Sequence, residues 1–195
     1  MSRIPNSIVA AVGATGLLVL AACADPAGTT APGTSASAAR SALVGGAGGG
    51  LVTIRDACDP TTFNAALQNP SACVRAGGVR FEKFLAELGE RQQVGGWRFA
   101  PSTVEMAEGG TLVAVNRGGE VHTFTEVEEF GGGINATLNE LSGNPVAAPE
   151  CLALRSVDFL AAGATQSETE DEAGDEHYQC CIHPWMRTTV HVRTD

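Results

Sequence analysis

Basic side chains are scarce in this chain. Its 195 residues include 12 lysines and arginines against 22 aspartates and glutamates, which gives a formal net charge of −10 at pH 7. Proteins that bind nucleic acid need a basic surface that displaces the counterions of the phosphates. The charge balance therefore argues against a nucleic-acid partner and favours docking to a partner with a cationic face.

The apolar run near the N-terminus is too short to span a bilayer. It extends from Ile8 to Leu20, follows Arg3 and ends at Leu20-Ala21-Ala22-Cys23, which matches the lipobox of bacterial lipoproteins. We therefore expect residues 1–22 to be a lipoprotein signal peptide and Cys23 to become the lipidated N-terminus. The mature protein would then be exported to the periplasm or cell surface and anchored to a membrane by its lipid. An ordinary secretory signal peptide with an incidental Cys23 is the alternative.

Large apolar residues are few between residues 23 and 50, where Ala, Gly, Ser, Thr and Pro dominate. Such a composition cannot form a core, so we expect a flexible tether. The remaining chain, about 145 residues, is long enough for one domain with a well-buried core.

Residues 51–95 are expected to form a helical N-terminal extension. Asp59 and Pro60 are typical of an N-cap followed by proline at the first helical position, which predicts a short helix over residues 61–67. A second helix over residues 79–91 is predicted by apolar side chains at helical spacing, namely Phe81, Phe84, Leu85 and Leu88. Cys58 and Cys73 bracket the first helix, and in an exported protein such a pair is most simply a disulfide.

From residue 96 onward the pattern changes to β. Short β-branched or alternating runs between Gly, Pro and acidic turns predict strands at residues 104–106, 112–116, 121–127, 152–159, 177–181 and 188–193. Several short strands at this density indicate a sandwich. Gly118 and Gly119 predict a hairpin or tight bend that places His122 early in the second of two strands. The segment from Phe130 to Glu150 is expected to be a long loop, of a kind that often carries function.

One short run near the C-terminus combines three metal-ligating side chains. Cys180, His183 and Met186 stand three residues apart in Cys180-Cys181-Ile182-His183-Pro184-Trp185-Met186. A thiolate and a thioether favour copper over hard cations, and two His, one Cys and a weak axial Met form a blue-copper site. The run contains three of these four ligands, so a second histidine is needed, and His122 is the candidate.

These residues resemble those of the cupredoxin family, and most closely its amicyanin and plastocyanin branch. The short Cys-x-x-His-x-x-Met loop with Pro184 after its histidine is similar to that of amicyanin, as is Asn116 six residues before His122. Further parallels are Trp97-Arg98-Phe99-Ala100-Pro101 at the start of the domain and Tyr178 two residues before the first cysteine of the loop. The resemblance covers residues 96–195.

The resemblance implies an all-β fold, a cupredoxin-like Greek-key β-sandwich over residues 96–195. It also implies one type 1 copper per chain, bound by His122, Cys180, His183 and Met186, with His183 nearer to solvent as the exit for the electron. The implied function is that of a blue-copper protein, not an enzyme, which carries single electrons between redox partners in the cell envelope.

A copper-handling lipoprotein for storage or delivery is the alternative function. Such proteins usually present several Met or His, whereas Met106 and Met186 are the methionines that follow the signal peptide. Four histidines in total cannot form the second copper centre of an oxidase or nitrite reductase. A zinc site is disfavoured because zinc prefers four strong N or S ligands to a Met. A purely structural lipoprotein domain would need none of these ligands.

Thr123 and Cys181, which directly follow two of the proposed ligands, need separate interpretation. Thr123 stands where many blue-copper proteins have an Asn that ties the two ligand loops together, and a hydroxyl has fewer donors and acceptors than an amide. Adjacent strand residues point to opposite faces. With Cys180 as the ligand by family spacing, Cys181 points away and Cys151 becomes its natural disulfide partner, although connectivity cannot be read from sequence.

Other polar residues give weaker signals. His177 and His191 fit ordinary strand positions. The acidic run at residues 168–176 fits a solvated loop, with docking to a partner as the second interpretation.

Overall fold

The computed structural model describes residues 48–194. The predicted signal peptide at residues 1–22, the predicted lipidation site Cys23 and the predicted tether up to residue 47 lie outside the described residues.

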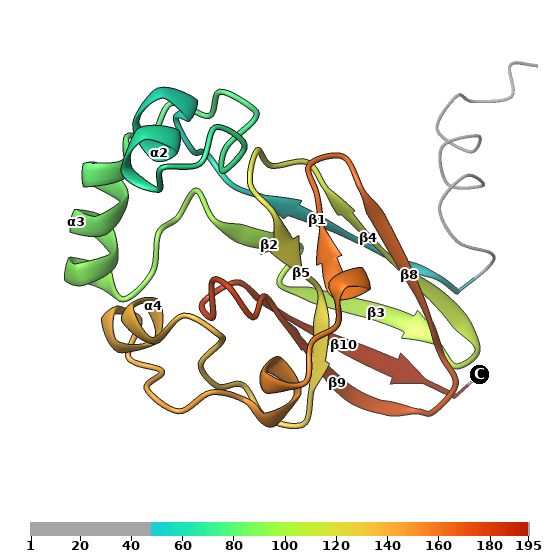
Figure 1. Cartoon of the computed structure of the whole chain (residues 1–195). Helices are drawn as coiled ribbons and strands as arrows, with labels where there is room; N and C mark the ends of the chain where they lie inside the picture. Colours follow the sequence, from blue (N-terminus) through green and yellow to red (C-terminus); the bar gives the residue numbers. More distant parts are fainter. Residues whose placement is uncertain (1–47, 195) are drawn as a thin grey trace, which may run out of the picture. The chain divides into compact units, whose positions relative to one another are not determined.

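Two four-stranded sheets face each other across one core (Figure 1). The first sheet has the order β2-β1-β4-β8, with β1 at Gly50–Arg55, β2 at Arg98–Ala100, β4 at Gly110–Asn116 and β8 at Thr165–Glu170. The second has the order β3-β10-β9-β6, with β3 at Thr103–Ala107, β6 at Thr125–Val127, β9 at Gly174–Gln179 and β10 at Arg187–Arg193. A separate pair consists of β5 (His122–Thr123) and β7 (Phe159–Leu160). The fold is the all-β, cupredoxin-like sandwich that the sequence predicted.

Alternation of side chains along the strands produces this core. β10 buries Thr188, Val190 and Val192 and leaves the residues between them more exposed. In the facing sheet, Val52 and Ile54 of β1 are both 0% exposed. Burial of one such side chain stabilises the fold by about 1.5–3 kcal/mol.

The sandwich begins earlier than the sequence suggested. β1 runs parallel to β4 and pairs with β2 on its other side, so residues 50–55 are part of the first sheet. The expectation that residues 51–95 form a helical extension before a domain starting at residue 96 is corrected here. Because β1 follows a glycine-rich stretch, its short alternating pattern, with Val52 and Ile54 facing inward, is easily missed.

The two predicted helices are present between β1 and β2. α2 (Pro60–Ala66) is capped by Asp59, whose side chain accepts a hydrogen bond from Thr62 N at 2.8 Å. α3 (Phe81–Arg91) buries Phe84 and Leu88 and ends at Gln92, which adopts a left-handed conformation. No helix between residues 48 and 194 has both the length and the apolar character that crossing a membrane requires.

Three segments differ from their predictions. The expected loop at residues 130–150 contains a further helix, α4 (Ala136–Leu141), capped by Asn135. The expected strand at residues 152–159 is replaced by two 3-10 turns, Pro149–Leu152 and Ser156–Asp158, before β7. The acidic run at residues 168–176 was expected to be a solvated loop, but it lies largely in β8 and β9. Its polar side chains are compatible with an exposed strand that pairs along one side, as β8 does with β4.

Candidate metal centre

The structure brings the predicted histidine from the middle of the chain to the C-terminal ligand loop. His122 begins β5, while Cys180 directly follows β9 and His183 lies in the turn before β10. The Nδ1 atoms of His122 and His183 lie 3.7 and 3.8 Å from Cys180 Sγ. Their ligand atoms are thus within 4.8 Å of one another, so the fold places two imidazoles and a thiol around one point.

The ligand loop is a closed, buried turn. Cys180 N donates to Met186 O at 3.0 Å, and Met186 N donates to His183 O at 2.9 Å. Cys180 and Met186 are both 0% exposed and His183 is 5% exposed. The loop therefore holds the thioether of Met186 in the core, on the same turn as the other two predicted ligands.

The donor set fits a copper ion. Cys180 is the free cysteine of residues 48–194, so its sulfur is available as a thiolate. The sulfur–nitrogen separations of 3.7 and 3.8 Å are shorter than the sum of typical metal–thiolate and metal–imidazole bonds, about 4.3 Å for zinc. One ion can therefore bond all three atoms, and the soft sulfur donors favour copper.

Thr123 joins the two ligand segments. Its hydroxyl accepts a hydrogen bond from Cys181 N at 2.8 Å, and its own backbone N–H points to Cys180 Sγ at 3.5 Å. Thr125 donates to the same hydroxyl at 3.0 Å. The threonine thus makes part of the link that the resemblance assigns to an asparagine.

Asp56 is a residue of the site that the sequence analysis missed. Its Oδ2 lies 2.9 Å from His122 Nε2, and both side chains are at most 1% exposed. The carboxylate also accepts from the backbone N–H groups of Gly119 and Glu120 at 2.8 and 2.9 Å. Since Nε2 faces an ionised acceptor, Nε2 carries the proton and Nδ1 is left free to bind a metal. A single aspartate after an unrecognised strand gave no sequence signal.

The turn between β4 and β5 is shaped to reach Asp56. Asn116 Nδ2 donates to Glu120 O and Leu160 O at 2.8 and 2.9 Å, while its Oδ1 accepts from Gly118 N at 2.9 Å. A Cβ at Gly118 would clash with the Asp56 carboxylate, so only glycine permits this approach. β4 and β5 do not pair with each other; the predicted Gly-Gly element is the tight bend and not a hairpin.

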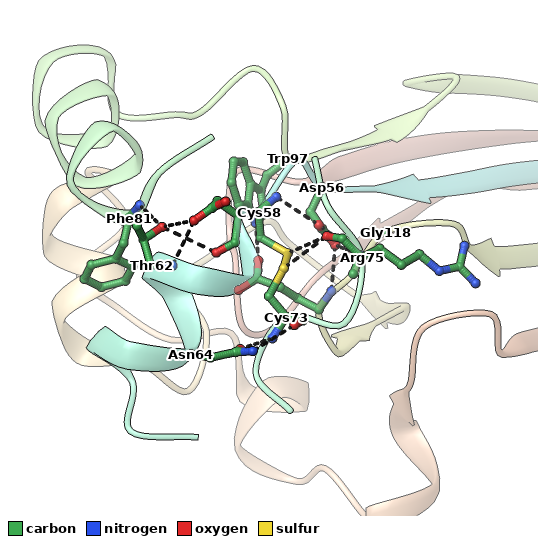
Figure 2. Close-up of a disulfide and its surroundings, with 12 residues drawn as sticks. Asp56, Cys58, Thr62, Asn64, Cys73, Arg75, Phe81, Trp97 and Gly118 are labelled. Atoms are coloured by element: carbon green, nitrogen blue, oxygen red, sulfur yellow. Dashed lines mark hydrogen bonds between the residues drawn. A yellow bond between two sulfur atoms is a disulfide. The ribbon is translucent and has the colours of Figure 1, made fainter. Parts of the chain in front are cut away.

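The Cys58–Cys73 disulfide anchors the segment that carries Asp56. The predicted bond is present, with a Cα–Cα distance of 6.2 Å and a sequence separation of 15. Figure 2 shows it beside Asp56, Gly118 and Trp97. The bond therefore lies next to the carboxylate that contacts His122.

The second predicted disulfide joins Cys151 to Cys181. Both residues are buried in a small cluster with Val127 and Ala148, apart from the main core. Cys180 belongs to the main core and Cys181 to this second cluster, so the two side chains point to different sides, as expected. The bond fixes the 3-10 turn at residues 149–152 to the start of the ligand loop.

Glu120 is a second buried carboxylate beside the histidines. Its Oε2 accepts a hydrogen bond from Trp97 Nε1 and lies 3.8 Å from His183 Nε2, too far for a hydrogen bond. Burial raises the pKa of Glu120 more than His183 and Trp97 lower it. The contact of Glu120 with His183 is therefore looser than that of Asp56 with His122.

The protonation of the site fits a thiolate ligand. Burial opposes ionisation of Cys180, but hydrogen bonds with the two histidines lower the pKa of its thiol well below the usual value. Burial also opposes a charged His122, yet its hydrogen bonds to Asp56 and Cys180 raise the pKa of the imidazole. For Asp56, burial is outweighed by hydrogen bonds from His122 and two backbone N–H groups, which lower the pKa to about 2.

His183 is nearer to solvent than His122, as the resemblance implies, but it is not open. The ring of Phe84 from α3 packs edge-on against it, with 6.4 Å between ring centroids, and Trp185 lies at 5.4 Å. The remaining histidines lie away from the site: His177 contacts Glu128 O at 3.3 Å, and His191 pairs with Asp175 at 2.6 Å.

Comparisons with known proteins found matches among solved structures. No protein-family model and no curated protein matches the chain. A purple cupredoxin from Nitrosopumilus maritimus matches with a TM-score of 0.42 and 14% identity over 74% of this chain and 99% of its own. A reduced Cu(I) amicyanin variant matches with a TM-score of 0.35 and 22% identity over 49% of this chain and 73% of its own. A second reduced amicyanin variant matches with a TM-score of 0.33 and 24% identity over 47% of this chain and 70% of its own. The chain's own sheets and ligand loop give it a cupredoxin-like fold.

Proposed function

We propose that this protein is a type 1 (blue) copper protein that carries single electrons between redox partners in the cell envelope. The proposal is carried by two imidazole Nδ1 atoms at 3.7 and 3.8 Å from one free, buried thiol, with a buried thioether in the same loop. These are the donors of a blue-copper site. When bound, copper supplies a centre that gains and loses one electron between Cu(II) and Cu(I).

The residues that would hold the ion are His122, Cys180, His183 and Met186. His122 begins β5, and Cys180 directly follows β9 of a different sheet. Thr123 links the two segments through its hydrogen bond with Cys181 N, so the paired strands fix the positions of these two donors. Asp56 keeps the His122 ring in the orientation that presents Nδ1. Such partners of ligating histidines raise ligand basicity and typically change metal affinity 10–100-fold when mutated.

Electrons would enter and leave through His183. It is 5% exposed, whereas the other three ligands are 0% exposed. The surface around it carries exposed apolar side chains from the helical segment and the β4–β5 turn, namely Leu67, Leu85 and Val121. A redox protein that docks here would meet an apolar patch on a chain of net charge −10, which suits a cationic partner face.

We place the protein outside the cytoplasm, held to a membrane by a lipid on Cys23, in the periplasm or at the cell surface. Two disulfides support an oxidising compartment. Globomycin treatment of expressing cells tests the anchor: accumulation of unprocessed precursor is expected, and unchanged processing would contradict lipidation.

The visible spectrum of the copper-loaded protein tests the metal centre. We expect one copper per chain, an intense blue colour in the oxidised form and loss of that colour in Cys180→Ser. A colourless Cu(II) protein would contradict the proposal. The alternative, copper storage or delivery, is separated by measuring copper transfer to a chelating acceptor alongside electron self-exchange. Fast self-exchange with slow copper transfer supports an electron carrier over a copper-storage or delivery protein.

A further inference from the structure

A cavity of about 440 Å³ opens beside His183. Its walls come from three helices and the ligand loop: Phe63 of α2, Phe81 and Phe84 of α3, Leu138 of α4, and His183 itself. This volume lies within the range of small-molecule sites, about 300–1,000 Å³. The cavity is separate from the candidate metal site, because the candidate ligands already pack closely around Cys180.

The walls indicate an aromatic ligand. Phe63 lies 5.1 Å from Phe81 and 5.6 Å from Phe84, both in edge-to-face geometry, so the rings form one continuous aromatic surface. Another ring packs well against such a surface, in offset or edge-on contact. Among the described residues that line the cavity there is no lysine or arginine, which disfavours an anionic ligand.

One polar side chain in the wall has an oxygen that can accept a hydrogen bond from a ligand. Glu120 lines the cavity and is 7% exposed. Its Oε2 accepts from Trp97, but no residue between 48 and 194 donates to its Oε1. This oxygen is not among the fully buried atoms that lack a partner, so it can accept a hydrogen bond from a molecule in the cavity. A ligand hydroxyl would satisfy it.

We infer that this cavity binds an uncharged aromatic molecule with a hydroxyl group, that is, a phenol. Its ring would pack on the phenylalanines of α2 and α3, and its hydroxyl would donate to Glu120 Oε1. Polar side chains at the rim, Asn69, Ser71, Asn135 and Thr137, leave room for a substituent that can hydrogen-bond. The bound ring would lie against the wall formed by His183, on the face where we propose that electrons are exchanged. The binding itself does not depend on the metal centre.

Calorimetric titration with p-cresol tests the site, and 4-methylanisole is the matched probe because it keeps the ring but has no donor. With the whole protein, with and without copper, we expect saturable binding of p-cresol, about tenfold or more tighter than 4-methylanisole. In Glu120→Gln the amide oxygen is needed to accept from Trp97, which leaves the NH2 group, a donor, at the position of Oε1. The ratio of the two affinities should therefore fall toward one. Absence of saturable p-cresol binding, or equal affinity for the two probes, would overturn the inference.

Two variants that add bulk at lining residues from different segments locate the binding. Ala72→Trp and Thr137→Phe add bulk at lining positions, whereas Ala76→Trp adds the same bulk at an exposed position of the same segment as Ala72. We expect p-cresol binding to be lost in the first two and kept in the third. If one filling variant does not fold, by circular dichroism, the other decides. Unchanged affinity in a folded filling variant contradicts the site, and leaves the copper proposal untouched because that is tested by the metal spectrum.

Discussion

Two aspartate–histidine pairs lie toward opposite ends of the sandwich and in different surroundings. Asp56 and His122, 2.9 Å apart, have side chains 1% and 0% exposed beside the ligand loop. Asp175 and His191, 2.6 Å apart, are 56% and 24% exposed on β9 and β10, near the acidic β8–β9 turn. In Figure 1 this turn lies at the far end of β9 from the loop that contains Cys180. The two pairs have the same chemistry but different solvent access.

This difference shows what burial adds to an ion pair. An exposed pair is solvated and contributes about 0–1 kcal/mol. A buried pair whose carboxylate also accepts backbone hydrogen bonds fixes the imidazole in one orientation, because any other would leave a charge without a partner. Asp56 therefore sets the geometry of His122, while Asp175 is one of several charges on a wet surface.

Removal of the two histidines should give the largest contrast. We expect His122→Ala to lose copper binding at one equivalent, together with the blue colour, because a ligand and the partner of Asp56 are both removed. His191→Ala should bind one copper with an unchanged spectrum. Elemental analysis and absorbance measure both, and circular dichroism checks that each variant is folded. A His122→Ala protein with full copper content and wild-type colour would remove His122 from the site.

Loss of the Cys58–Cys73 disulfide should have the next largest effect. The double variant Cys58→Ser/Cys73→Ser opens a loop with a sequence separation of 15. Chain entropy predicts a loss of about 3 kcal/mol in the free energy of unfolding, measured by urea denaturation. Because this loop follows Asp56 directly, we also expect weaker copper binding in the folded variant. Unaltered copper affinity would show that β1 alone positions Asp56.

Replacement of the aspartates sharpens the comparison directly. Asp56→Asn keeps the shape but removes the charge, so we expect copper affinity to fall about 10–100-fold. The matched variant Asp175→Asn should change copper affinity less than twofold, since its partner His191 is not a ligand. Competition with a chelator of known affinity measures both. Equal effects of the two substitutions would refute the role of Asp56 in orienting His122.

The sequence predicted which residues meet at the Cys180 loop better than it predicted their surroundings, for physical reasons. The ligand loop is local, so the spacing of Cys180, His183 and Met186 carries its chemistry within seven residues. The partners Asp56 and Glu120 come from a strand end and a turn, and their roles arise only when distant segments meet. β8 was missed because its exposed polar side chains hide the alternation that marks a strand, and α4 because a short helix inside a Gly-rich segment gives little periodicity.

The smallest predicted effect concerns pH and the far end of the sandwich. Burial, and then the hydrogen bond and charge of Glu170 with a contribution from Glu172, raise the pKa of Glu176 to about 7 from the usual 4.5. Below pH 4.5 the glutamate is protonated in both the folded and the unfolded chain. Between pH 4.5 and 7 the folded protein retains a proton that the unfolded chain has lost. The free energy of unfolding should therefore fall as pH rises through this window and level off above it.

Glu176→Gln tests this assignment, since an amide can stay hydrogen-bonded to Glu170 without a charge at any pH. We expect the fall between pH 4.5 and 7 to become shallower and the variant to be more stable than wild type at pH 8, by denaturation of the metal-free protein. The same substitution at the exposed Glu172 serves as the control, because that side chain is solvated and should change the curve less. If Glu176→Gln and wild type have identical pH profiles, solvent relieves the carboxylate repulsion at this end of the sandwich. The two ends would then differ in metal chemistry alone.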